Sequence, residues 1–184
     1  MPQAIRPRGA VLLKVVSIIM IILGAISIVS GVSSMFSGRM MAGFFDLDEF
    51  GIRYFQVVGA MALITGAVEL AFGIIGVRLC GRFDKAGFLL VIGIIQILVT
   101  AFSALYNKMM EQAGMRVVEQ ILEATAQNYG ASVSMDPSAY AGLMGNPGLA
   151  AANFILPALF IVGALLNRMR PGAPAAPAQG QEGF

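Results

Sequence analysis

Hydrophobic residues along the chain form four runs that are separated by shorter polar stretches. The second run, 54–79, reads YFQVVGAMALITGAVELAFGIIGVRL, and Glu69 is its only acidic residue. A helix rises about 1.5 Å per residue, so a run of this length crosses a hydrocarbon layer of about 30 Å. The same reasoning applies to the other runs, of which the last is the shortest. The sequence therefore predicts four transmembrane helices, at about 11–34, 54–79, 86–106 and 149–166.

Small residues recur along one face of the first three predicted helices, at alternating steps of three and four positions. This alternation has a period of about 3.5 residues, which is typical of helices that pack closely in a left-handed bundle. Small side chains let two helix backbones approach each other. We therefore predict a helix-packing seam that contains Gly24, Gly31, Gly59, Gly66, Gly73, Gly76 and Gly93.

The connections between the runs predict which helices are neighbours. Residues 80–87 form a turn so short that the second and third helices must be antiparallel neighbours. The outer loop at 37–52 mixes acidic residues with phenylalanines, which indicates a segment at the membrane surface. The outer loop at 108–148 begins with an amphipathic stretch that continues the third helix without a proline, and Asp136 caps a second, short helix. The sequence thus predicts an all-α fold, a four-helix transmembrane bundle with a small helical extracytoplasmic cap.

The last predicted helix contains two residues that interrupt its apolar pattern, Asn153 and Pro157. Because proline removes a backbone hydrogen bond, we expect a kink at this point. The same two residues could instead mark a broken helix around a ligand. We assign residues 1–170 to the transmembrane domain, and we expect the tail 171–184, rich in Pro, Ala and Gly, to be disordered in the cytoplasm.

The composition supports a membrane protein, since 58% of the residues are hydrophobic and only 12% are charged. In soluble domains charged residues supply about a quarter of the total. The lipid bilayer is therefore the first expected partner. The net charge of +2 is small and dispersed, which argues against nucleic acid as a second one.

The distribution of Lys and Arg predicts the orientation in the membrane, because cytoplasmic loops carry an excess of these residues. One side of the predicted bundle has Arg6, Arg8, Lys14, Arg78, Arg82, Lys85, Arg168 and Arg170, and the other has Arg39, Arg53, Lys108 and Arg116. We therefore expect both termini to lie in the cytoplasm, and the protein to reside in the plasma membrane.

Residue types that support catalysis or metal binding are scarce. The chain has no His and one Cys, Cys80, and it shows no Gly-rich phosphate loop, zinc-ligand spacing or nucleophile with an adjacent base. We expect neither an enzyme, nor a cofactor, nor a metal site. Cys80 lies at the inner membrane surface, where it could be acylated or simply pack.

The predicted layout resembles that of tetraspanins: four spans, a small first outer loop, a tight inner turn and a larger second outer loop. Intramembrane polar residues, here Glu69 and Gln96, and a juxtamembrane cysteine, here Cys80, are similar in kind to features of that family. The resemblance is one of topology, since the second outer loop has no Cys-Cys-Gly motif and the chain has no Trp.

Glu69 and Gln96 form the candidate intramembrane polar pair. In an antiparallel hairpin they lie at nearly the same depth, about 13–14 Å and about 16–17 Å from Arg78 and Lys85 respectively. Because desolvation favours the neutral acid, we expect Glu69 to be protonated and to donate a hydrogen bond to Gln96. Glu69 could bind a proton or cation in a functional site, or only hold two helices together. The polar residues Thr100, Ser103 and Asn107 are also spaced along one helical face, where they could line a wet vestibule or serve as helix contacts.

Two functions follow from these observations. The first is a non-catalytic interaction or scaffold protein that presents the segment 108–148 to a membrane-protein partner or to a second copy. In this reading the apolar face formed by Val117, Ile121 and Leu122 binds the partner. The alternative is a small proton- or cation-coupled transporter or channel subunit centred on Glu69.

Overall fold

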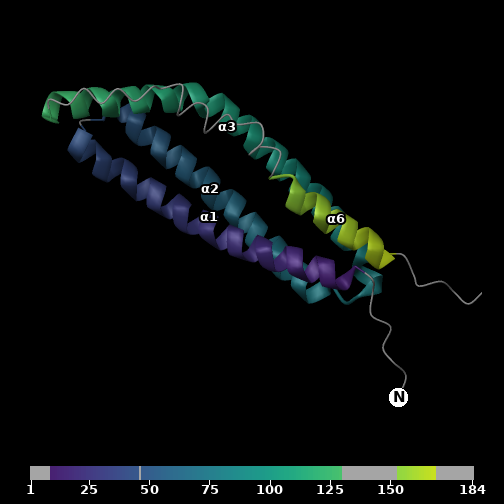
Figure 1. The fold of residues 1–184 in the computed structure, drawn as a ribbon. Helices are drawn as coiled ribbons and strands as arrows, with labels where there is room; N and C mark the ends of the chain where they lie inside the picture. Colours follow the sequence, from purple (N-terminus) through teal and green to yellow (C-terminus); the bar gives the residue numbers. More distant parts are fainter. Residues whose placement is uncertain (1–8, 46, 130–152, 169–184) are drawn as a thin grey trace, which may run out of the picture.

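The fold is all-α, as the sequence predicts (Figure 1). The computed structural model describes residues 9–45, 47–129 and 153–168, and these contain no β-strand. The elements are α1 (Ala10–Phe45), α2 (Glu49–Leu79), the short 3-10 helix η1 (Phe83–Lys85), α3 (Ala86–Tyr129) and α6 (Ile155–Arg168).

Helices α1, α2 and α3 are each long enough and apolar enough to cross a membrane. Helix α6 is also apolar, but its 14 residues span only about 21 Å. The first four positions of the span predicted at 149–166 lie outside the described residues. The structure therefore shows three helices of membrane-spanning length and a shorter fourth one.

The connection between α1 and α2 is much shorter than the predicted outer loop 37–52. Helix α1 continues to Phe45, and α2 begins at Glu49. No proline occurs in 37–52, so the chain stays helical on both sides of a tight turn. Asp48 sets the start of α2, because its carboxylate accepts a hydrogen bond from the backbone N–H of Gly51 at 2.8 Å. The expected surface-lying loop is thus wrong over most of its length.

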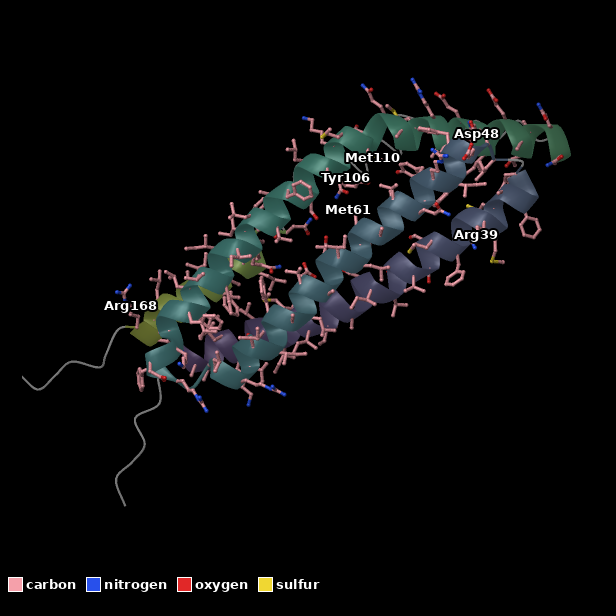
Figure 2. All side chains as sticks on the ribbon, turned by 180° about the vertical axis from the view of Figure 1, so that it is seen from behind. Arg39, Asp48, Met61, Tyr106, Met110 and Arg168 are labelled. Atoms are coloured by element: carbon pink, nitrogen blue, oxygen red, sulfur yellow. The ribbon has the colours of Figure 1, made fainter. Side chains whose placement is uncertain are left out.

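Glycines bring α1 and α2 into backbone contact along an antiparallel pair of helices, which run side by side in Figures 1 and 2. A Cβ added to Gly24 would lie 2.7 Å from the carbonyl oxygen of Gly66. A Cβ added to Gly31 would lie 2.7 Å from that of Gly59. Both distances are shorter than any real contact of a Cβ atom. The two backbones therefore touch at steps of seven residues on each helix, where only glycine fits.

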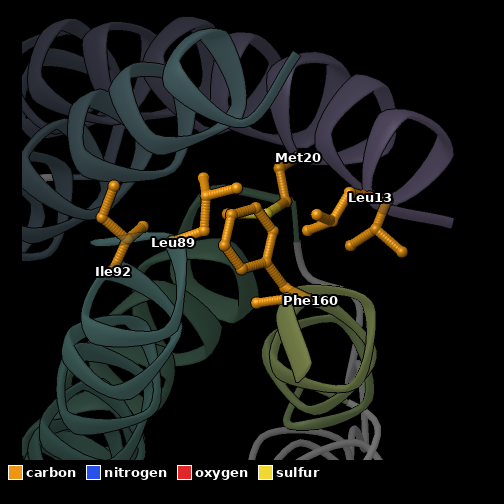
Figure 3. Close-up of a cluster of buried hydrophobic side chains, with 7 residues drawn as sticks. Leu13, Met20, Leu89, Ile92 and Phe160 are labelled. Carbon is orange, nitrogen blue, oxygen red and sulfur yellow. The ribbon is translucent and has the colours of Figure 1, made fainter. Parts of the chain in front are cut away.

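The hydrophobic core lies at one end of the molecule, where α1 and α3 begin and where α2 and α6 end (Figure 3). Phe160 of α6 is 1% exposed and packs among buried side chains of α1 and α3. A hydrogen bond closes this end, since Asn167 Nδ2 donates to the carbonyl oxygen of Cys80 at 2.7 Å. The buried members of the core are Leu13, Val16, Met20, Leu89, Ile92, Phe160 and Ala164.

Helix α3 is a single helix of 44 residues, about 66 Å long, and so extends well past the end of the predicted span at 106. The expected continuation of the third helix past residue 106 is confirmed, and 108–129 is therefore helix rather than loop. The part of α3 around Gln120 lies over the start of α2. A Cβ added to Gly51 of α2 would be 3.3 Å from the Gln120 side-chain oxygen. The short helix expected at Asp136 and the tail 171–184 lie outside the described residues.

Pro157 does not kink a helix. Helix α6 begins at Ile155, so the proline occupies the first turn. Backbone N–H groups in a first turn have no partner within the helix, and the missing N–H of proline costs nothing there. Asn153 precedes the helix in a turn.

Candidate functional site

A cavity of about 380 Å³ separates the polar face of α3 from the hairpin of α1 and α2. It lies beyond the hydrophobic core, toward the end where α1 connects to α2. Figure 2 marks this region by Met61 on α2 and Tyr106 on α3. The described lining residues are Met20, Leu23 and Ser27 of α1, Met61, Ala62, Thr65 and Glu69 of α2, Gln96, Thr100, Ser103, Ala104 and Asn107 of α3, and Asn153, Leu156 and Pro157 at the start of α6.

Helix α2 contributes one wall of the cavity through residues three and four positions apart. Thr65 and Glu69 share this face because they are one helical turn apart. The Thr65 hydroxyl donates to the carbonyl oxygen of Met61 at 2.9 Å, as threonine commonly does within a helix. It also lies 3.2 Å from the Ser103 hydroxyl, and this contact joins α2 to α3.

Helix α3 contributes the opposite wall through Gln96, Thr100, Ser103 and Asn107. The Thr100 hydroxyl donates to the carbonyl oxygen of Gln96 at 2.9 Å, which keeps this donor within its own helix. The seam residue Gly93, one turn before Gln96, has a different neighbour: a Cβ added there would lie 2.5 Å from a side-chain carbon of Ile161 in α6. The face of α3 that carries Gly93 and Gln96 thus has two neighbours. Its Gly93 end packs on α6, and the part from Gln96 to Asn107 lines the cavity.

Glu69 and Gln96 line the same cavity, but no hydrogen bond joins them in the described structure. Gln96 is 2% exposed, and its Oε1 has no hydrogen-bond partner. The expected hydrogen bond from Glu69 to the Gln96 carbonyl is therefore wrong, although both side chains line the same space. Helix α2 packs closely on α1 and α3 packs on α6, and the hydroxyl contact between Thr65 and Ser103 joins the two polar faces across the gap.

An unpartnered buried oxygen is costly, at about 1–3 kcal/mol. A cavity of this volume has room for many water molecules, since one water needs about 10–15 Å³ on a comparable measure. Carboxyl, amide and hydroxyl oxygens are therefore available to a polar occupant. The site can accept hydrogen bonds and can offer one negative charge, that of Glu69.

The other glycines of the predicted seam lie at the α1–α2 contact. A Cβ on Gly73 would be 2.7 Å from the carbonyl oxygen of Ser17. A Cβ on Gly76 would be closer still to the Ser17 hydroxyl and also 2.8 Å from Phe160. Gly73 and Gly76 thus bury the α2 backbone against α1, next to the core.

The predicted partner-binding face is only partly available. Val117 is 1% exposed, so it cannot contact a partner without a rearrangement, and its assignment as a binding residue is wrong. Ile121 and Leu122 are half-buried. The apolar face fails as a single surface because this part of α3 folds down onto the start of α2.

Cys80 is half-buried, and its thiol donates to the carbonyl oxygen of Val77 at 3.2 Å. Acylation of this residue stays a prediction. Among the described residues no group of three or more His, Cys, Asp or Glu side chains is arranged to hold a metal ion.

Thr65 is the site residue that sequence reasoning missed. Its signal was present, since it lies four positions before Glu69 on a helix and must share a face with it. Threonine in an apolar helix commonly bonds its own backbone, so its type alone does not mark a site.

Comparison with protein-family models, with curated proteins and with solved structures finds no match for this chain.

Proposed function

We propose that this chain is an integral membrane protein that binds a proton or cation at Glu69, and that it acts as a small cation- or proton-coupled transporter or channel subunit. The observation that carries this proposal is the shared cavity: Glu69 and the buried, unpartnered Gln96 line one space without bonding each other. Two residues that only held helices together would satisfy each other.

The surroundings of the cavity support the same function. Ionisable residues inside transmembrane helices are rare, and they often mark ion or substrate pathways. Glu69 lies far from both ends of α2. It is twenty residues after the start of the helix at Glu49 and ten residues before its end at Leu79. Hydroxyl and amide groups of α3 extend the polar lining from Gln96 to Asn107, over about 16 Å.

The experiment is a flux measurement on the purified chain in liposomes. The wild-type protein should carry protons or monovalent cations at a rate that depends on pH, and Glu69→Gln should abolish this flux. Glu119→Gln is the matched control, because Glu119 is an exposed acid on α3 that does not line the cavity. Equal flux in the wild type and in Glu69→Gln would refute the proposal.

A second function, an interaction protein, is favoured by the part of α3 beyond residue 106, which is longer than a membrane requires. With Val117 buried, the contact surface would consist of Ile121, Leu122 and their polar neighbours. Replacing both Ile121 and Leu122 by Glu should then reduce recovery of crosslinked partners or second copies from native membranes. Unchanged recovery would exclude this surface.

The orientation with both termini in the cytoplasm of the plasma membrane belongs to the same proposal. Its support is the excess of Lys and Arg on one side, together with a fold that brings Gly9 next to Asn167. Cysteines placed near the two chain ends, in a Cys80→Ser background, should both resist a membrane-impermeant thiol reagent applied outside intact cells. Labelling of one end alone would contradict the arrangement.

A further inference from the structure

The cavity contains one acidic group and no basic group to neutralise it. Among the described lining residues, Glu69 is the only one that carries a charge: α1 contributes Ser27 and apolar residues, α3 contributes amides and hydroxyls, and α6 contributes Leu156 and Pro157. The segment 130–152 cannot supply a cation, since the sequence has no Lys or Arg from 117 to 167. A carboxylate in such surroundings requires a proton or an external cation.

The size and layout of the cavity do not fit a tightly coordinated divalent metal ion. Such ions are held by oxygen ligands at about 2.0–2.6 Å in a compact cage. Here the side-chain oxygens are spread along α3 from Gln96 to Asn107, and the cavity measures about 380 Å³. Pockets for small organic molecules occupy about 300–1,000 Å³. The volume therefore matches an organic ligand of modest size.

The walls of the cavity differ in polarity. Apolar side chains of Met20 and Leu23 on α1, Met61 on α2 and Leu156 on α6 face the same space as the polar residues of α3. Apolar ligand groups would lie against these side chains, with dispersion contacts to the two adaptable methionines. The polar side offers acceptor oxygens, among them the unpartnered Oε1 of Gln96.

From this combination we infer that the cavity binds a monovalent organic cation with an apolar body, such as a substituted ammonium ion, with Glu69 as its counter-charge. This inference rests on the proposed function and names its substrate class. In the absence of the cation, the proposal places a proton on the Glu69 carboxyl group, because an unpaired carboxylate in these surroundings is costly. When the cation binds, the O–H bond of the acid breaks, the proton goes to solvent, and the carboxylate pairs with the cation.

The experiment compares two probes of nearly the same shape on the purified full chain in lipid nanodiscs. Phenyltrimethylammonium carries a positive nitrogen where tert-butylbenzene carries a neutral carbon. Calorimetric titrations, corrected with empty nanodiscs, should show that the cation binds at least about tenfold more tightly, because only it can pair with the carboxylate. Binding should release about one proton per cation and should weaken as the solution is acidified, since protons compete for Glu69.

Three variants make the test specific. Glu69→Gln should weaken cation binding at least about tenfold and abolish proton release, while binding of the neutral probe stays unchanged. Glu69→Asp keeps the charge and should retain part of the cation binding. Ala104→Phe, which places a ring in the cavity, should weaken both probes. Elution of each variant as a single folded species separates these effects from misfolding.

The inference is overturned if the neutral probe binds as tightly as the cation, if Glu69→Gln binds the cation like the wild type, or if the cation does not bind. These results are distinguishable from failure of the proposed function. Flux of protons or inorganic cations that requires Glu69, without binding of phenyltrimethylammonium, would leave the proposed function standing and reject only the organic substrate. Absence of both would reject both.

Discussion

The two faces of α2 form interfaces of opposite kinds. Toward α1, Gly59 and Gly66 let the backbones touch, and no room remains for a side chain at these two positions. Toward α3, Thr65 and Glu69 line an open cavity. The two rows are separated by only a fraction of a helical turn. In α2, packing density thus differs between two lines of residues on the same helix. The line of glycines lets the neighbouring backbone approach closely, and the line with polar side chains does not.

The largest expected effect comes from breaking the tight interface. Gly66→Leu would place its Cβ 2.8 Å from the carbonyl oxygen of Gly24 and 2.9 Å from the Ser27 Cβ, so α1 and α2 must separate. We expect a loss of about 3 kcal/mol or more of folding free energy. Thermal unfolding in detergent measures it. Gly43→Leu is the control, because a Cβ at Gly43 meets nothing within 4 Å.

A stability for Gly66→Leu equal to that of Gly43→Leu would mean that the glycine contacts do not hold the two helices together.

A smaller effect of the opposite sign is expected in the open interface. Gln96→Leu has a similar shape and removes the buried oxygen that lacks a partner. The variant should be as stable as the wild type or more stable by about 1 kcal/mol. It should nevertheless lose flux, because the cavity loses an acceptor. Parallel unfolding and liposome measurements on one preparation check both results.

A clear loss of stability in Gln96→Leu would show instead that the amide holds the bundle together, and would favour the purely structural interpretation of the polar pair.

The smallest effect concerns the hydroxyl contact across the cavity. Thr65→Val and Ser103→Ala should show a coupling of about 0.6 kcal/mol in a double-mutant cycle, because interhelical hydrogen bonds in membranes are weak. Thr125→Val paired with Ser103→Ala is the control cycle, since the Thr125 hydroxyl bonds the carbonyl oxygen of Ile121 in its own helix. That control should show no coupling.

A coupling several times larger would mean that this contact, rather than the packing of α3 on α6, sets the position of α3.

The periodicity of small and polar residues predicted much of this arrangement. It placed Gly24, Gly31, Gly59 and Gly66 on packing faces, and it placed Gln96, Thr100 and Ser103 on one face of α3. Such predictions succeed because the helical repeat fixes which residues share a face. The all-α class followed from the lengths of the apolar runs.

The distance between faces could not be predicted in the same way. Glu69 and Gln96 line the same cavity, yet the gap between them depends on how α3 packs against α6. The small and polar residues of α2 also belong to two neighbouring rows: Gly59, Gly66 and Gly73 face α1, while Ala62 and Glu69 face the cavity. A repeat of about 3.5 residues does not tell one row from the next.

The hydrogen bond from Asn167 to the carbonyl oxygen of Cys80 ties the end of α6 to the turn between α2 and α3, beside the buried ring of Phe160. This contact closes the end of the bundle that holds the core. If the chain carries a solute, as proposed, a solute in the cavity would meet this closed end on its way through. Passage across the membrane would then require α6 to separate from that turn.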